Sequence, residues 1–188
     1  MKKIMFSEQY GLQQAVLEGR KTMTRRFAEK VLVEDEKGSL CWNGEFKKPR
    51  YKVGEVVAVA QKYKDIMSYL ADSFRQPSPN YMMDKPGYNN KMFVRADLMP
   101  HHIRITSVRI ERLQDISNED CMREGVWKLE SDGCPTMFTF DGWRFKNKVN
   151  RCTDSPKEVF EALFKKLSGR KVWDDNPWVF VYEFELVK

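Results

Sequence analysis

Hydrophobic and polar positions alternate along the chain in a way that predicts two amphipathic helices. Apolar residues recur at helical spacing over residues 7–18, where Ser7 can cap the first turn and Gly19 suits the left-handed conformation that ends a helix. A second helix opens at Ser155, a cap residue followed by a proline favoured in the first turn, and ends at Gly169. Its apolar face consists of Val159, Phe160, Leu163, Phe164 and Leu167.

A shorter helix is predicted to begin after Ser117. This serine can cap the helix together with Asp120 three residues later, as in a capping box, and Gly125 ends the helix after one or two turns. The last residue before this glycine is Glu124, and a negative charge at the carboxyl end of a helix costs roughly 0.3 to 1 kcal/mol. We therefore expect a positively charged partner beside Glu124.

Three further segments have the pattern of β-strands. The β-branched run 53–60 is typical of a strand that is covered on both faces or closed into a barrel. Aromatic residues at every second position of 178–186 indicate a strand with one aromatic face. A weaker pattern predicts a strand at 91–95.

The segment 103–113 is also predicted to be a strand, with an irregularity inside it. Ile103 and Ile105 alternate in one phase, whereas Val108 and Ile110 alternate in the opposite phase. Because side chains of a regular strand keep a period of two, this change of phase predicts a β-bulge or a strong bend.

The remaining segments are less regular. Residues 34–52 read as a hairpin or loop with one buried aromatic residue, Trp42, and 76–90 read as a long surface excursion. Residues 127–151 read as an insertion or hairpin of low regularity. Together the patterns predict a single α+β domain, 1–188, with a central β structure and no internal repeat.

Composition narrows the class of protein. A chain of 188 residues with 41% apolar residues has enough material for one hydrophobic core without a disulfide or metal. No run approaches the roughly 20 apolar residues that a membrane-spanning helix requires, and the start of the chain lacks the apolar core of a signal peptide. We therefore expect a cytoplasmic protein without a membrane partner.

Charge favours an anionic partner. The chain carries 33 Lys and Arg against 27 Asp and Glu, a net charge of +6, and nucleic acid or a nucleotide is the leading class of partner. The alternative is a basic protein whose charge only keeps it soluble. The four cysteines form no CxxC pair, and the only histidines, His101 and His102, would point to opposite faces of a strand. We expect no metal and no cofactor.

The segment 20–26, Arg-Lys-Thr-Met-Thr-Arg-Arg, holds the candidate chemistry. On a turn or short helix, Lys21 and Thr24 would face the same way, and neighbouring arginines would lower the pKa of the lysine. A neutral amine beside a hydroxyl is the pairing that activates a nucleophile, and Glu124 would pair with Lys21 or pass a proton to a leaving amine. Two points oppose this hypothesis: Glu124 would raise the pKa of Lys21, and the segment also fits a solvated turn that binds phosphate without specificity.

This segment resembles the ASCH domain family. Gly19, Lys21 and Arg26 match the family motif GxKxxExR, and Thr24 stands where many members have glutamate. The similarity extends to 54–57, to 113–117 with the following Glu124-Gly125, and to 178–184. A threonine at this position resembles the branch of small ASCH proteins that are amidohydrolases acting on N4-acetylcytidine.

The resemblance implies a PUA-like fold, a mostly antiparallel β-barrel with short flanking helices. Segments near 34–52, 62–90 and 127–171 have no counterpart in those much shorter amidohydrolases and are expected to be long insertions in the single domain. In its length the chain is similar to uncharacterised ASCH-like proteins of phages and prophages.

For the site, the resemblance implies that Lys21, Thr24 and Glu124 are catalytic. Thr24 would attack the acetyl carbonyl after losing its proton to Lys21, while backbone amides near the turn would stabilise the oxyanion. Glu124 would protonate the departing cytosine amine, and water would then release acetate. The substrate would be a modified nucleoside or RNA.

Four further residues are candidates for substrate or RNA binding. Arg20, Arg25 or Arg26 would orient the base or a phosphate, and Gln61, at the end of the strand in 53–60, would read the base through its side-chain amide. For Gln61 the alternative is a polar group at a strand end with no role in binding.

A non-catalytic module that binds RNA or a nucleotide is the alternative function. PUA-like barrels hold RNA beside the first helix, and the basic segment would contact the backbone while Tyr81, Tyr88 and Trp143 stack on bases. These three aromatic residues are also compatible with local packing under long loops.

Overall fold

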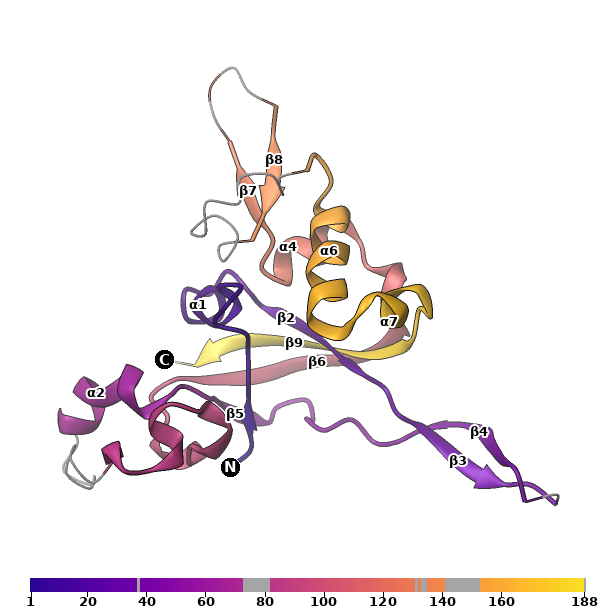
Figure 1. Ribbon diagram of the computed structural model, residues 1–188, viewed down its shortest axis with the longest axis horizontal. Helices are drawn as coiled ribbons and strands as arrows, with labels where there is room; N and C mark the ends of the chain where they lie inside the picture. The colour runs from indigo at the N-terminus through magenta and orange to yellow at the C-terminus, as the bar shows by residue number, and fades with distance from the viewer. Residues whose placement is uncertain (37, 73–81, 131, 133–134, 141–152, 188) are drawn as a thin grey trace.

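The computed structural model describes residues 1–36, 38–72, 82–130, 132, 135–140 and 153–187. Its centre is a five-stranded sheet, and α1, α4, α6 and α7 lie together on one side of it (Figure 1). The strands of this sheet are β1 (Lys3–Ile4), β2 (Met23–Phe27), β5 (Val56–Val59), β6 (His102–Arg112) and β9 (Trp178–Val187). The helices are α1 (Leu12–Leu17), α2 (Met67–Asp72), α4 (Asn118–Arg123), α6 (Pro156–Ser168) and α7 (Arg170–Asp174).

Two hairpins and several short turns complete the fold. The hairpins are formed by β3 (Lys30–Glu34) with β4 (Leu40–Phe46), and by β7 (Trp127–Leu129) with β8 (Met137–Thr139). The 3-10 turns cover Tyr63–Ile66, Pro86–Tyr88, Lys91–Phe93, Ala96–Leu98 and Leu113–Asp115. No helix of the described ranges has both the length and the apolar character needed to cross a membrane.

The strand order of the central sheet is β1-β5-β6-β9-β2, with β1 parallel to β5 and every other pair antiparallel. The predicted α+β class and the mostly antiparallel sheet are therefore confirmed. Among the described residues, β1 and β2 are edge strands that do not pair with each other, so the strand pairing does not close the predicted barrel.

Long strands β6 and β9 form the middle of the sheet, and their pairing confirms the predicted bulge. The register runs from His102 opposite Val187 to Arg112 opposite Trp178, and it shifts between Ile105 and Ser107. This shift is where the alternation of apolar residues changes phase. The β-branched run in β5 is buried on both faces, as predicted, because Val57, Ala58 and Val59 are all inaccessible to solvent.

Two of the three predicted helix starts are confirmed in detail. The Ser117 hydroxyl accepts a hydrogen bond from the Asp120 amide at the start of α4, and the Ser155 hydroxyl accepts one from the Glu158 amide at the start of α6. The first helix begins later than predicted, at Leu12. Here Ser7 contributes its backbone carbonyl, which accepts from the Leu12 amide, and not its side chain.

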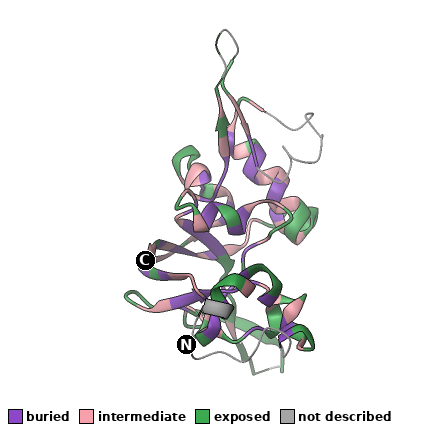
Figure 2. Cartoon of the chain, turned by 90° about the vertical axis from the view of Figure 1, so that its left-hand side faces the viewer, coloured by how far each residue is buried: buried purple, intermediate pink, exposed green. Residues whose placement is uncertain are grey.

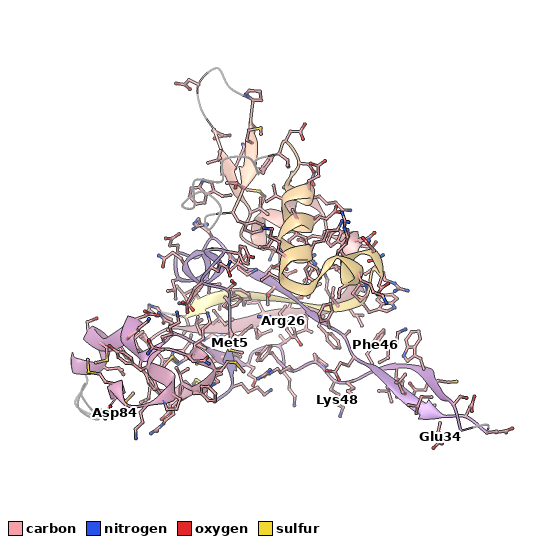
Figure 3. The ribbon with its side chains drawn as sticks, viewed as in Figure 1. Met5, Arg26, Glu34, Phe46, Lys48 and Asp84 are labelled. Carbon is pink, nitrogen blue, oxygen red and sulfur yellow. The ribbon has the colours of Figure 1, made fainter. Side chains whose placement is uncertain are left out.

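Three predictions of local structure were wrong. Segment 20–26 is not a helical turn, because its second half forms β2, where pairing with β9 replaces local hydrogen bonds. Trp42 is 41% exposed because the β3–β4 hairpin projects away from the sheet with only its base against it (Figures 1 and 3). Residues 91–95 contain a 3-10 turn at Lys91–Phe93 where a strand was expected.

The interior consists of two clusters of buried apolar side chains. The larger lies between the sheet and the helices α1, α4, α6 and α7, where buried residues gather in Figure 2. The smaller lies beneath residues 62–72 and 82–99 and includes Tyr63, Leu70 and Met82, with Tyr88 packed against it. Tyr88 therefore contributes to packing under a long segment, whereas Tyr81 and Trp143 lie outside the described residues.

The cap of α4 yields a prediction about stability, since this helix carries Asp120 and leads to Glu124. Replacing Ser117 with alanine leaves the Asp120 amide without its acceptor, and we expect the free energy of unfolding to fall by about 1 kcal/mol. Ser117→Asp supplies another acceptor and should stay close to the original protein. Urea denaturation measures both variants; equal stability of the two would contradict the capping role.

Candidate functional site

A cavity of about 410 Å³ lies along the edge strand β2. Its walls come from the chain before α1, from β2, from the end of α4 and from α6, with Lys21, Thr24 and Glu124 all in the lining. Because β2 pairs only with β9, its other edge is open to this cavity. Residues from both faces of β2, including Thr24 and Arg25, therefore reach the lining.

Lys21 is buried and bound to the end of α4. Its ammonium donates to the Glu124 carboxylate at 2.5 Å, to the Glu124 carbonyl at 2.7 Å and to the Met23 carbonyl at 2.7 Å. An ammonium has three hydrogens, and these three acceptors use all of them. The positive partner that the position of Glu124 at the end of a helix predicts is therefore present, from 103 residues earlier in the chain.

Burial governs the electrostatics of this lysine. Removal from water lowers the pKa of Lys21, and the positive charges of Arg26 and Arg25 act in the same direction. The Glu124 carboxylate opposes these effects through its charge and its hydrogen bond, as expected from the sequence, but the pKa of Lys21 remains below its ordinary value. The proton between the two groups is thus held less firmly by the amine than in water.

Arg25 binds the second oxygen of the Glu124 carboxylate. Its guanidinium donates to Glu124 at 3.1 Å, to Glu111 at 2.6 Å and to Asp120 at 2.9 Å. Burial alone would lower the pKa of Arg25, but these carboxylates raise it above its ordinary value. Arg25 lines the cavity, yet its side chain is engaged by three acids, so it positions Glu124 and is not available to orient a substrate as predicted.

The ion pairs continue away from the cavity through α4. Arg109 contacts Asp120 and Glu183, and Arg123 contacts the same two acids. In addition, the Arg123 carbonyl accepts a hydrogen bond from the Thr22 amide. These contacts tie α4 to the sheet and fix the position from which Glu124 reaches Lys21.

Thr24 supplies the hydroxyl of the site. Its side chain is buried, with 5% of the residue exposed, and lines the cavity. No hydrogen bond of the Thr24 hydroxyl occurs among the described residues, and in particular none joins it to the Lys21 amine. The structure therefore brings the three predicted catalytic residues to the lining of one cavity, where Lys21 and Glu124 are in direct contact.

Arg26 is the exposed cation of the cavity. It donates to the Met5 carbonyl at 2.7 Å, and both residues appear near the middle of the molecule in Figure 3. Within the described part of the chain, no carboxylate forms an ion pair with Arg26. Of the arginines in the basic segment, this one has donors available for a substrate.

The structure does not bring Arg20 or Gln61 to the cavity. Arg20 pairs with Glu18 at 2.6 Å, and its guanidinium lies 4.3 Å from the ring centre of Trp127. The side-chain carbonyl of Gln61 is 2.7 Å from His101 Nδ1, in the smaller cluster's part of the molecule. Gln61 therefore lies outside the lining of this cavity, in contact with His101.

Sequence reasoning missed the aromatic wall of the cavity. Phe160 and Phe164 of α6, together with Phe27 of β2 and Phe6, line it. Helix α6 falls in the segment expected to be a long insertion, and it covers one side of the site. A signal was present in its apolar face, which extends to Leu167; this residue stays 48% exposed because it faces the cavity and not the core.

No group of three or more His, Cys, Asp or Glu side chains in the described ranges is arranged to hold a metal ion. Cys121 is buried beside the ion pairs, and burial raises the pKa of its thiol to about 12, so it is not a nucleophile at neutral pH. The polar groups in the cavity lining include the Lys21 amine, the Thr24 hydroxyl, the Glu124 carboxylate and the exposed Arg26 guanidinium, together with Ser7, Lys91 and Ser168.

The Lys21–Glu124 contact predicts a large effect on stability. In Glu124→Gln, the buried Lys21 ammonium loses its counter-ion, and we expect the free energy of unfolding to fall by about 3 to 5 kcal/mol. Glu119→Gln changes an exposed acid of the same helix and should alter it by less than about 0.5 kcal/mol. Guanidinium denaturation compares them; a loss below 1 kcal/mol in Glu124→Gln would show that the pair is not held as described.

Comparison with known proteins gives no information on the function of this site. No protein-family model, no curated protein and no solved structure matches this chain. What the site does must therefore be argued from its own residues.

Proposed function

We propose that the protein is an amidohydrolase that removes an acyl group from an N4-acylated cytosine in a nucleoside or in RNA. One observation carries this proposal: Lys21, Thr24 and Glu124 line a single cavity, which combines a hydroxyl without a hydrogen bond to any described residue and a buried amine–carboxylate pair. The resemblance of the basic segment to the ASCH amidohydrolases agrees with it, and membership of that family is part of the proposal.

The first step is the activation of Thr24. Because burial lowers the pKa of Lys21, its proton can pass along the 2.5 Å hydrogen bond to Glu124, which leaves a neutral amine and a carboxylic acid. The amine then accepts the proton of the Thr24 hydroxyl as its oxygen attacks the acyl carbonyl carbon. Lys21 becomes an ammonium again, and the former carbonyl oxygen becomes an oxyanion.

The open edge of β2 offers a donor for that oxyanion. The Thr22 carbonyl accepts from the Phe184 amide, and the Ala28 amide donates to the Trp178 carbonyl, so even-numbered residues bond to β9. Alternation along an antiparallel strand then directs the amide of Arg25 to the open edge, next to Thr24. This backbone N–H, together with the Arg26 guanidinium, supports the predicted stabilisation of the oxyanion.

Glu124 completes the reaction. When the tetrahedral intermediate collapses, the carbon–nitrogen bond breaks and the protonated Glu124 gives its proton to the departing amine, which leaves an acyl ester on Thr24. The same pair then activates the water that hydrolyses this ester. The Lys21 proton passes to Glu124, and the amine takes a proton from the water as it attacks the ester carbonyl. Collapse returns a proton to the Thr24 oxygen and releases the carboxylic acid.

The shape of the cavity agrees with a planar substrate. Aromatic rings of Phe6, Phe27, Phe160 and Phe164 form its apolar walls, and the polar groups gather where Lys21 lies. A heterocyclic base is planar and apolar on both faces, so aromatic walls bind it well.

A non-catalytic binding module is the second candidate, and one observation favours it. All three hydrogens of the Lys21 ammonium are donated to acceptors other than Thr24. In this alternative Lys21 only binds the carbonyl end of α4, and the protein holds a nucleotide or RNA through Arg26 without altering it.

Removal of the hydroxyl distinguishes the two candidates. Thr24→Val keeps the branched shape but removes the nucleophile, and we expect kcat/KM for N4-acetylcytidine to fall by more than about a thousandfold. Release of cytidine and acetate, measured by chromatography, is the readout.

Two matched variants serve as controls. Thr24→Ser retains a hydroxyl and should keep measurable activity, while Thr106→Val changes an exposed threonine outside the cavity lining and should leave kcat/KM nearly unchanged. The amidohydrolase proposal fails if the original protein releases no acetate, or if Thr24→Val remains as active as Thr106→Val.

The shared proton of Lys21 and Glu124 predicts the form of the pH profile. The pair is active with one proton, so activity falls at high pH once that proton leaves and no acid remains for the departing amine. Because burial lowers the pKa of Lys21, the alkaline limb of kcat/KM should have an apparent pKa below 10.5. Activity that rises steadily through pH 10.5 would contradict this mechanism.

A further inference from the structure

A second cavity adjoins the first on the other side of Arg26. It measures about 370 Å³ and shares Met5, Arg26 and Phe27 with the first cavity. Phe180 and Tyr182 of β9 also line it, and they lie opposite Arg26 and Thr24 in the register of β2 with β9. The second cavity therefore lies on the sheet face to which the side chains of Thr24 and Arg26 belong.

This second cavity is rich in cations. Five basic residues line it against one acid, Glu29, which already pairs with Lys47 at 2.7 Å. Lys3 is also engaged, because its ammonium donates to the carbonyls of Met92 and Val94. The other three are Arg26, Lys48 and Arg50.

These three cations form no ion pair with a carboxylate anywhere in the described ranges of the chain. The Arg50 charge repels Arg26, although the Glu124 carboxylate attracts Arg26 more strongly without forming an ion pair with it. Like charges gathered in a hollow without a carboxylate in contact leave room for an anion, which would reduce their mutual repulsion. Guanidinium groups suit a phosphate in particular, since their N–H groups match its oxygens in pairs.

A buried hydroxyl adds a fixed donor to the same cavity. Tyr182 is only 1% exposed, and its oxygen accepts a hydrogen bond from the Arg50 amide at 3.0 Å. The phenol hydrogen remains to be donated, and no acceptor for it occurs among the residues that the structure describes. By contrast, the neighbouring Tyr51 hydroxyl donates to the Lys3 carbonyl at 3.0 Å.

We propose that this second cavity is a phosphate-binding subsite, formed by Arg26, Lys48, Arg50 and Tyr182, for a substrate whose base occupies the first cavity. The substrate is then a nucleotide or a nucleotide within RNA, and not a free nucleoside. This inference rests on the proposed function for the identity of the base, while the phosphate site itself is argued from this cavity alone. Thr24 and Arg26, two residues apart on a strand, are separated by about 6.5 Å, so one ligand can contact both.

The kinetic test compares three substrates: N4-acetylcytidine, its 5′-monophosphate and a short RNA that contains it. We expect kcat/KM to be at least tenfold higher for the phosphorylated substrates. In Lys48→Ala/Arg50→Ala this preference should disappear, while activity on the nucleoside stays unchanged. Tyr182→Phe should reduce the preference several-fold. A further gain for RNA over the monophosphate would identify a chain as the ligand, and no further gain would identify a mononucleotide.

A matched control separates this effect from the loss of net charge. Lys64→Ala/Arg170→Ala removes the same two charges from exposed positions outside both cavities and should keep the preference. The subsite is refuted if the original protein treats nucleoside and nucleotide alike, or if the control double variant loses the preference to the same degree.

Binding alone tests the subsite when no hydrolysis occurs. Titration calorimetry with cytidine 5′-monophosphate should show binding that weakens with salt and is lost in Lys48→Ala/Arg50→Ala but retained in Thr24→Val. Such binding without any acetate release would uphold the phosphate subsite and reject the amidohydrolase function. Hydrolysis of the nucleoside without any effect of phosphate would uphold the amidohydrolase function and reject the phosphate subsite.

Discussion

The fold around the candidate site depends on one buried carboxylate, Glu124, held between Lys21 and Arg25. Removal of such charges from water costs several kcal/mol for each ion, and only close, well-oriented partners offset that cost. Here the carboxylate receives Lys21 on one oxygen and Arg25 on the other. The contact joins the end of α4 to the start of β2, two segments about 100 residues apart, and it fixes the inner end of the cavity.

The same arrangement explains why the cavity lies where it does. Strand β2 pairs with β9 on one side only, and α6 covers its other side with aromatic residues instead of another strand. Polar backbone groups at an open edge need partners, and here one of them, the Met23 carbonyl, accepts from Lys21. The edge strand thus presents a hydroxyl, a guanidinium and backbone amides to an otherwise apolar hollow.

The buried pair of Lys21 and Glu124 can stabilise the fold and also take part in chemistry, because both roles have the same physical cause. The low dielectric that makes Lys21 and Glu124 bind each other tightly also lowers the pKa of the amine, and so brings the neutral pair within reach. The second cavity, close to the pair, adds the positive charges of Arg26, Lys48 and Arg50, and no ion pair with a described carboxylate makes these charges part of the stability of the fold. Arg26 lines both cavities, and in the proposed function it connects the recognition of an anion with the chemistry at Thr24.

Local features of this protein followed from the sequence, because they depend on neighbours within a few residues. The caps at Ser117 and Ser155 and the bulge near Thr106 are of this kind, as is the need of Glu124 for a cation. The sequence also selected Lys21, Thr24 and Glu124 as a set. The sequence already offered Lys21 as the partner of Glu124. Only the tertiary structure decided that Arg25 is buried among acids while Arg26 stays exposed, and that α6 forms a wall of the site. These outcomes depend on which distant segments pack together, and the spacing of residues along the chain carries no record of that packing.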